Sequence, residues 1–431
     1  METLKFGNGN WATKEGSTLA YNDENNNFKP LPFDFTRAST ATYVDSDGLI
    51  KTAKQGEARI DYTDSSDGVL LLEPARTNLL TYSEDFSQWT ALNLTVADNN
   101  SISTDGTLNA SKLTASSGTS IKRIGLGGMP TSSVTRAFSV FIKTNNINAI
   151  QLLHSGDLQG YANFDLQNNV VGSAGSKTTS KIENYGNGWH RCTAIFDSTN
   201  AQGSTLYLNI KDNANGGYGG DTSQVGDLYV FGAQLEQGSY ATSYIPTNGS
   251  TVTRIAETAS GSGNSEVFND SEGVLFADIA ALADDGTSRR ITITDNSGDN
   301  FFNIVSLELD EASNNLKAFI SSSTSITAFL FTSLNQSQNN KIALKYNSSS
   351  ADLFVNGYNV QTNQNPNLPT GLVNLDFNNG KVPSGSDFYG KTKQVGYYDT
   401  ILTDLELETL TSYTSWVSMV NELNLNIIYN G

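Results

Sequence analysis

Carboxylates on alternate residues of a strand could cleave glycosidic bonds, and the chain carries one such pair. Glu308 and Asp310 lie two residues apart in a strand-like run, so their side chains are expected on the same side. A retaining glycosidase needs an acid and a nucleophile about 5 Å apart, each in its own environment. Because the next alternate position, Ala312, has no carboxyl group, the pattern favours a solvated strand edge over a catalytic centre.

A second pattern has the letters of a phosphate-binding loop. It is the run GSDFYGKT from Gly385 to Thr392. That motif works only between a buried strand and a helix whose amino end faces the phosphates. Here an Asn- and Pro-containing stretch precedes it and an alternating, strand-like run follows, so we expect no nucleotide binding.

The chain is poor in the side chains that most often act as nucleophiles or transition-metal ligands. The single cysteine, Cys192, shares the face of a predicted strand with His190, Ala194 and Phe196. A catalytic thiol needs an electropositive setting, so we interpret Cys192 as a small core residue. Two histidines, His154 and His190, cannot form a histidine-rich metal centre. We therefore predict a protein that is not an enzyme and requires no cofactor.

Calcium is the one metal for which the sequence offers ligands. Asp295 and Asp299 belong to an oxygen-rich turn, and a similar stretch spans residues 61–67. Carboxylate and amide oxygens are the ligands that calcium prefers. Since Asp and Asn also favour turns for backbone reasons alone, a calcium site at Asp295 and Asp299 and an ordinary turn both remain as interpretations.

Sugar binding requires an exposed aromatic ring for stacking and nearby amides or carboxylates for the hydroxyl groups. The first candidate is a glycine-rich segment in which glycines on both sides of Tyr218 leave its ring nothing local to pack against. Its proposed sugar-binding residues are Asn213, Asn215, Tyr218 and Asp221. The alternative is that Tyr218 folds back over a sheet edge.

The second sugar-binding candidate is the tip of a predicted hairpin. Asn356 and Gly357 form the strongest short-range turn signal in the chain. Tyr358 would supply the ring, and Asn356 and Asn359 would supply the amides. The alternative is that Tyr358 caps a core.

The composition predicts the elements that must hold these residues. The chain has 431 residues, 37% of them hydrophobic and 10% aromatic, which suits about two to four domains. Short alternating strands separated by Gly and Asn turns, with almost no helical periodicity, predict β-sandwiches. The exception is a helix expected after Thr403, which forms a capping box with Glu406 and precedes apolar residues at helical spacing up to Val420.

The same patterns divide the chain into five segments. We predict an all-β fold, with a small loop-rich N-terminal module followed by two β-sandwich (jelly-roll) domains and one C-terminal helix. The boundaries are an extended β module over 1–78, a jelly-roll domain over 79–250, a linker over 251–265, a second sandwich over 266–410, and a C-terminal helix and tail over 411–431.

The net charge of −18 repels phosphate backbones, so nucleic acid is not an expected partner. No stretch approaches the roughly 18 apolar residues of a membrane span, and Met1 is not followed by a secretory signal. The sequence therefore predicts a protein made in a cytoplasm, without membrane insertion.

Two stretches resemble the entry module of bacteriophage tail-fibre and head-fibre proteins. They read PFDFTRASTATYV over 32–44 and LLEPARTNLLTYSEDFSQW over 71–89. In that class they lead into a jelly-roll domain and a concanavalin A-like lectin domain. Here, residues 79–250 resemble a jelly-roll carbohydrate-binding module, and 266–410 resemble a laminin G or concanavalin A-like lectin fold.

The resemblance implies a structural virion protein that displays lectin-like domains toward a host-surface polysaccharide. It further implies contacts with other virion proteins through residues 1–78, a homotrimer, and a location in the virion after assembly in the host cytoplasm. Two alternatives stay open. One is a depolymerase that cuts the same glycan, and the other is a purely structural decoration protein of the capsid or tail.

Overall fold

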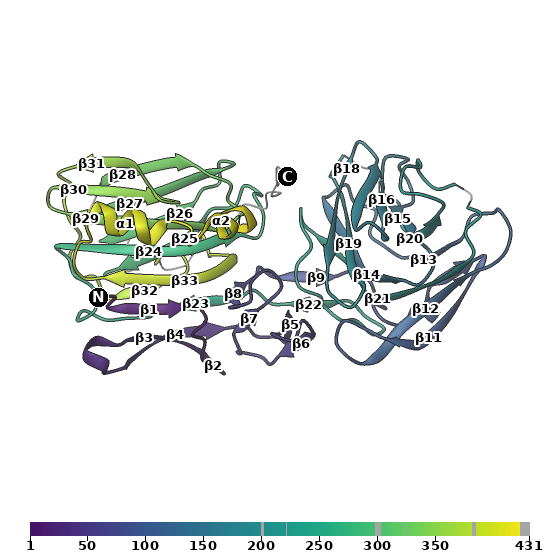
Figure 1. Cartoon of the computed structure of the whole chain (residues 1–431), viewed down its shortest axis with the longest axis horizontal. Coiled ribbons are helices and arrows are strands. Elements are labelled where there is room, and N and C mark those ends of the chain that lie inside the picture. Colours follow the sequence, from purple (N-terminus) through teal and green to yellow (C-terminus); the bar gives the residue numbers. More distant parts are fainter. Residues whose placement is uncertain (200–201, 221, 298–302, 324, 382–384, 423–431) are drawn as a thin grey trace. The chain divides into compact units, whose positions relative to one another are not determined.

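The computed structural model describes residues 1–199, 202–220, 222–297, 303–323, 325–381 and 385–422. Its described strands pair antiparallel throughout, and the predicted all-β class is confirmed. The chain separates into two compact units (Figure 1). Unit 1 comprises Met1–Thr40, Ala53–Pro74 and Ala256–Gly431, and unit 2 comprises Ala41–Thr52 and Ala75–Ile255.

Unit 1 contains one large and one small sheet. The large sheet runs in the order β23 (Thr258–Ser260), β4 (Lys29–Thr36), β3 (Ser17–Asn22), β1 (Leu4–Gly7), β33 (Gly390–Tyr398), β24 (Glu272–Ala281), β29 (Asn340–Asn347), β30 (Ser350–Val355) and β31 (Tyr358–Gln364), with β2 (Thr13–Lys14), β7 (Arg59–Asp61) and β8 (Val69–Leu72) attached at its side. The small sheet runs β28 (Ser325–Ser333), β27 (Asn315–Ser322), β26 (Ile304–Leu309), β25 (Arg289–Thr294) and β32 (Asn374–Asp376).

The N-terminal strands belong to this sandwich and do not form a module of their own. Strand β1 lies between β3 and β33, with Phe6 opposite Val395 (Figure 1). In β4, Leu31, Phe33 and Phe35 are buried and alternate with exposed residues. This period-2 pattern places three apolar side chains in the same core as the second sandwich. The structure therefore differs from the predicted separate module over 1–78, because its apolar face is covered by strands from the other end of the chain.

The predicted linker over 251–265 is also ordered into strands. Val252–Arg254 forms β22 and pairs with β9 (Arg76–Asn78) in unit 2. Thr258–Ser260 forms β23 and pairs with β4 in unit 1. Small polar residues predicted exposure there, but their backbone groups find strand partners. The change of unit falls between Ile255 and Ala256.

Two short helices replace the single C-terminal helix that the sequence predicts. Helix α1 (Asp404–Thr411) begins at Thr403, and the predicted capping box with Glu406 is confirmed. The backbone turns extended at Ser412. Helix α2 (Trp416–Glu422) then starts afresh, with the Ser415 hydroxyl accepting from the Ser418 amide. The extended backbone at Ser412 therefore divides the helix that the apolar spacing predicts up to Val420.

The three chain segments that make up unit 1 meet in a buried network of ion pairs around Glu257. Its Oε1 lies 2.5 Å from Nη1 of Arg37 and accepts from Nε of Arg59 at 2.8 Å, while its Oε2 contacts Nη2 of Arg59. Arg59 also pairs with Glu73 at 2.9 Å. The four side chains are at most 3% exposed. Arg37 and Glu73 come from the two stretches on which the resemblance rests, so those stretches have a structural role here.

Unit 2 is a sandwich of two six-stranded sheets. One sheet runs β10 (Thr90–Leu92), β13 (Arg123–Leu126), β20 (Leu206–Lys211), β15 (Ala149–His154), β16 (Tyr161–Asp165) and β17 (Val170–Ala174). The other runs β11 (Leu94–Ile102), β12 (Leu108–Ala115), β21 (Gly226–Gln237), β14 (Arg136–Thr144), β19 (Trp189–Phe196) and β18 (Thr178–Asn184), and β5 (Ala41–Val44) pairs with β6 (Ile50–Ala53).

The core of unit 2 lies between these two sheets. It includes Cys192, Ala194 and Phe196 from β19 and Phe138 from β14. Cys192 is fully buried, and burial raises the pKa of its thiol. The prediction that this cysteine is a core residue is confirmed.

Burial of Asp376 in unit 1 gives a pH-dependent stability. Its carboxylate accepts the Gly261 amide at 2.8 Å, but desolvation raises its pKa from 3.8 to about 6. A carboxyl group with a raised folded-state pKa stabilises the fold below its unfolded pKa, and this contribution is lost as the pH rises through about 6. With about 1.4 kcal/mol for each pKa unit, the loss is at most about 3 kcal/mol.

We expect Asp376→Asn to make unit 1 more stable than the wild type at pH 8 and equal to it near pH 4. Asn keeps an acceptor for Gly261 and carries no charge. Differential scanning calorimetry across this pH range measures the effect. Asp310→Asn is the matched control with the opposite sign, because the Lys317 ion pair and hydrogen bonds hold the pKa of Asp310 below its usual value. An unchanged pH profile for Asp376→Asn would contradict this account.

Candidate functional site

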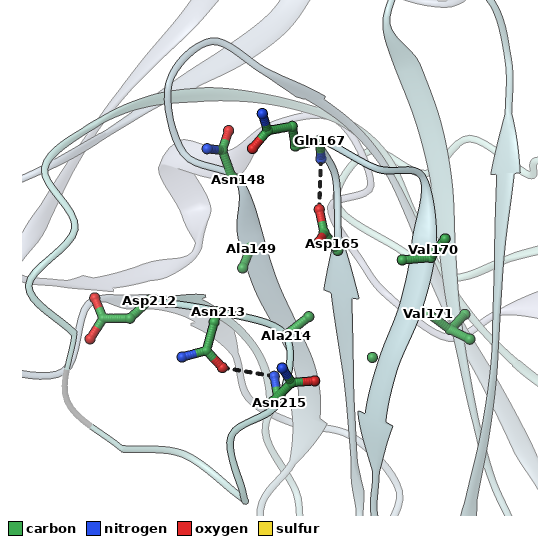
Figure 2. A pocket seen from close by; sticks show the side chains of 11 residues that line it. Asn148, Ala149, Asp165, Gln167, Val170, Val171, Asp212, Asn213, Ala214 and Asn215 are labelled. Carbon is green, nitrogen blue, oxygen red and sulfur yellow. Dashed lines mark hydrogen bonds between the residues drawn. The ribbon is translucent and has the colours of Figure 1, made fainter.

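A pocket of about 270 Å³ opens at one edge of the β15–β16–β17 sheet in unit 2 (Figure 2). Its volume is slightly below about 300 Å³, where typical small-molecule pockets begin. Amides, carboxylates and small apolar groups share its wall. The lining residues are Asn148, Ala149, Asp165, Gln167, Val170, Val171, Gly172, Asp212, Asn213, Ala214 and Asn215.

The wall of the pocket is formed by three chain segments that the strand register places side by side. Ala149 at the start of β15 lies opposite Asp165 at the end of β16 and opposite Lys211 at the end of β20. Asp165 in turn lies opposite Val170 on β17. The turn before β15, the turn between β16 and β17, and the segment after β20 therefore end at the same sheet edge, which is where the pocket forms.

The glycine-rich segment after β20, residues 212–220, is held against the sheet by hydrogen bonds from buried side-chain amides. Nε2 of Gln151 donates to Oδ1 of Asn163 and to the carbonyl of Gly217, both at 2.8 Å. Oε1 of Gln151 accepts from the Gly219 amide at 2.7 Å, and Nδ2 of Asn163 donates to the Gly216 carbonyl at 2.6 Å. Gln151 and Asn163 are fully buried. These bonds fix the backbone on which Asn213 and Asn215 stand.

The two pocket carboxylates are ionised at neutral pH because their oxygens accept local hydrogen bonds. The Asn168 side chain and backbone lower the pKa of Asp165. Hydrogen bonds from Thr222 and Ser223 lower the pKa of Asp212. In Figure 2 the Asp212 carboxylate points away from the other lining side chains.

Three amides are left available to a ligand. Among the described residues, no group hydrogen-bonds the side-chain amides of Asn148, Gln167 and Asn215, which are exposed. Asn213 uses Oδ1 to accept the Asn215 amide at 2.9 Å (Figure 2). On the opposite wall, Val170 lies on the same face of the sheet as its partner Asp165 and is 49% exposed, whereas Val171 pairs with Phe164 and is directed to the other face. The pocket thus presents amide donors and acceptors facing an apolar surface.

The structure brings together only part of the first predicted sugar site. Asn213 and Asn215 line the pocket, whereas Tyr218 folds back onto the sheet. The Tyr218 hydroxyl donates to the His154 carbonyl at 2.9 Å, and its ring meets Tyr161 edge-on at 6.2 Å. Burial raises the pKa of Tyr218. The predicted stacking role for Tyr218 is therefore replaced by a packing role, and Asp221 lies outside the described residues.

The second predicted site contains a structural residue. The Asn356–Gly357 hairpin is confirmed, with both residues at positive φ and β30 paired to β31. Asn356 joins the turn to β29, because its Oδ1 accepts from the Lys341 backbone amide and its Nδ2 donates to Oδ1 of Asn340. Tyr358 is 73% exposed and Asn359 is also exposed. Tyr358 does not cap a core, and it remains a candidate ring without Asn356 as its partner.

The possible hydrolase pair is engaged in ion pairs. Glu308 lies 3.0 Å from Arg290 and accepts from Ser288, and Asp310 lies 2.5 Å from Lys317. Both carboxylates are nearly fully buried. The predicted solvated strand edge is therefore wrong, because cations on the neighbouring strands cover both groups.

No metal site is found within the described ranges, where no group of three or more His, Cys, Asp and Glu side chains could hold an ion. Asp295 instead caps its own turn by accepting from Ser297 and Asn303. Asp299 lies outside the described residues. In the same described part of the chain, no helix has the length and apolar character needed to cross a membrane.

Most of the pocket was missed by the sequence prediction. Asn148, Gln167, Val170 and Val171 carry no local motif, and only their strand register joins them to Asn213. The signal that the sequence offered for this part of the pocket is the pair of adjacent valines, Val170 and Val171, in an otherwise polar region.

Comparisons with known proteins gave structural similarity only. No family model and no curated protein matches the chain. The Ruminococcus gnavus intramolecular trans-sialidase carbohydrate-binding module CBM40 has a TM-score of 0.31 at 15% identity, and covers 36% of this chain and 94% of its own. The same module bound to α2,3-sialyllactose gives 0.31 at 16% identity, with the same coverage. A leech intramolecular trans-sialidase gives 0.30 at 17% identity and is itself covered over 27% of its length.

Proposed function

We propose that the protein binds glycans through the pocket of unit 2 and does not cleave them. The observation that carries the proposal is the convergence of side-chain amides on an apolar wall. Amides can donate to and accept from sugar hydroxyls, and valine methyl groups can pack against the C–H face of a pyranose ring. The binding residues would be Asn148, Gln167, Asn213 and Asn215, with Val170 opposite.

The absence of catalysis is part of the proposal. The pocket carboxylates, Asp165 and Asp212, have lowered pKa values, whereas the general acid of a glycosidase needs a raised one. Glu308 and Asp310 are held by Arg290 and Lys317. These features support a binding protein over the alternative of a depolymerase.

We also propose a setting for this binding, which rests on the sequence resemblance. The chain would be a phage tail or head fibre, carried on the virion as a homotrimer and attached through other virion proteins. Weak single sites then gain strength from several copies acting together. Deleting residues 1–78 would not test attachment cleanly, because it would remove β1 and β4 from unit 1. Localising the chain on an intact virion tests the setting directly.

A glycan array and a reducing-end assay on the same polysaccharides test the proposed function. We expect binding without new reducing ends. Asn215→Ala and the double variant Asn213→Ala/Asn215→Ala should bind about tenfold or more weakly, since two hydrogen bonds to a ligand are worth about 1.4 kcal/mol or more. Release of reducing ends would favour the depolymerase, and no binding at high valency would favour a decoration protein.

The variant Tyr358→Ala/Asn359→Ala is the matched control, because it removes exposed groups of the same kind from the second candidate site. We expect its affinity to stay within about twofold of the wild type. If this control lost binding and the pocket variants kept it, the site would be the hairpin of unit 1.

A further inference from the structure

We propose that the pocket selects uncharged sugars and rejects sugars that carry a carboxylate. This inference rests on the proposed function and names the ligand class of the same site. It follows from the charges around the pocket and from the hydrogen bond that Lys211, next to the pocket wall in sequence, already makes.

The residues that line the pocket include two carboxylates, Asp165 and Asp212, and neither Lys nor Arg. Both carboxylates are ionised at neutral pH for the reasons given above. A ligand carboxylate would lie near the charge of Asp165 and, farther off, that of Asp212, which points away from the other lining side chains (Figure 2), and no lysine or arginine among the lining residues could pair with it. Sites that recognise carboxylates generally supply an Arg or Lys instead.

Lys211 is the cation next in sequence to the pocket wall, and it is already engaged. Its side chain is buried, and its ammonium donates to the carbonyl of Gly219. Its role is to hold the glycine-rich segment. Turning Lys211 toward a ligand would break this bond and release the backbone that positions Asn213 and Asn215, so Lys211 does not offset the two carboxylates.

The uncharged part of the wall is complementary to a neutral sugar. The free amides of Asn148, Gln167 and Asn215 match hydroxyl or acetamido groups. Val170 exposes an apolar surface on this wall, and a charged substituent placed against it would lose its hydration at a cost. An uncharged pyranose places hydroxyls on the amides and C–H groups on the valine.

Matched sugar pairs test the inference with the full-length protein. The probes are galactose and galacturonate, glucose and glucuronate, and lactose and 3′-sialyllactose, each displayed multivalently, with galacturonamide as an uncharged isostere of the acid. We expect each acid to bind at least about tenfold more weakly than its neutral partner, and the amide to regain most of the loss. Raising the salt from about 50 to 300 mM should strengthen only the acids, through screening.

Variants separate charge from shape. Asp212→Asn and Asp165→Asn keep acceptor atoms for the local turns, and we expect each to raise the affinity for the acids several-fold relative to that for their neutral partners. Asp47→Asn, an exposed carboxylate outside the pocket, should change neither. Tighter binding of an acid than of its neutral partner, with or without added Ca²⁺, would overturn the inference and leave the proposed function standing. No binding of any sugar would overturn both.

Discussion

Glu257→Gln is expected to lower the free energy of unfolding of unit 1 by about 3 to 5 kcal/mol. Glu257 is the shared partner of two guanidinium groups that have no access to solvent. Its Oε2 also accepts the backbone amide of Glu73 at 2.9 Å. Glutamine keeps the volume of the side chain but removes the charge that Glu257 supplies to both Arg37 and Arg59.

Denaturant unfolding of the full chain measures this loss. Glu266→Gln is the matched control, since Glu266 is exposed on a neighbouring turn, and it should change stability by no more than about 0.5 kcal/mol. The double variant Arg37→Met/Glu257→Met leaves the Arg59–Glu73 pair intact, and we expect it to regain at least half of the loss. If Glu257→Gln lowered the free energy of unfolding by less than about 1 kcal/mol, the network would not be what joins the three segments of unit 1.

Gly172→Ala is expected to weaken glycan binding about tenfold or more. A Cβ at this position would lie 2.1 Å from the carbonyl oxygen and 2.6 Å from the Cβ of Ala214. Both neighbours belong to the segment that carries Asn213 and Asn215, and the Ser173 amide donates to the same carbonyl at 2.9 Å. The segment must move away from β17, which separates the amides from the valine wall. We expect a stability cost of about 1 to 3 kcal/mol, as for other overpacked sites.

Gly217→Ala provides the comparison within the same segment. No atom lies within 4 Å of a Cβ built there, and its backbone φ is one that other residues adopt. We expect unchanged glycan affinity and nearly unchanged stability. Calorimetric titration of both variants with one neutral glycan decides the matter. Equal affinities would mean that the approach of β17 to Ala214 does not shape the binding site.

Local patterns predicted the parts of the fold that depend on neighbours in sequence. The Asn356–Gly357 turn and the Thr403–Glu406 capping box involve residues within three positions of each other, and both formed as expected. Strand alternation also gave the all-β class. These features are decided by backbone preference and by side-chain period.

The division into units depends on distant pairings that no local pattern reveals. Strand β1 is nearly 400 residues from its partner β33, and Glu257 joins Arg37 and Glu73 across about 200 residues. Period-2 alternation shows that Leu31, Phe33 and Phe35 share a buried face but does not identify what covers it. A separate N-terminal module was therefore the simplest expectation, although unit 1 supplies the cover.

The sequence predicted only part of the candidate site, because the rest also depends on pairings between residues that are distant in the sequence. Composition identified Asn213 and Asn215 because amides in a glycine-rich segment suit hydroxyl groups. It could not decide whether Tyr218 would stack on a ligand or pack on Tyr161, since both outcomes bury one face of the ring. The opposite wall, which contains Val170, depends on strand register alone.

Hydrogen–deuterium exchange of the full chain, with and without a saturating neutral glycan, tests the central claim most directly. The account predicts slower exchange in residues 165–172 and 212–217, which carry the two sides of the pocket, and no change in residues 355–364 of the unit 1 hairpin. Protection of the hairpin with none at the pocket would contradict it.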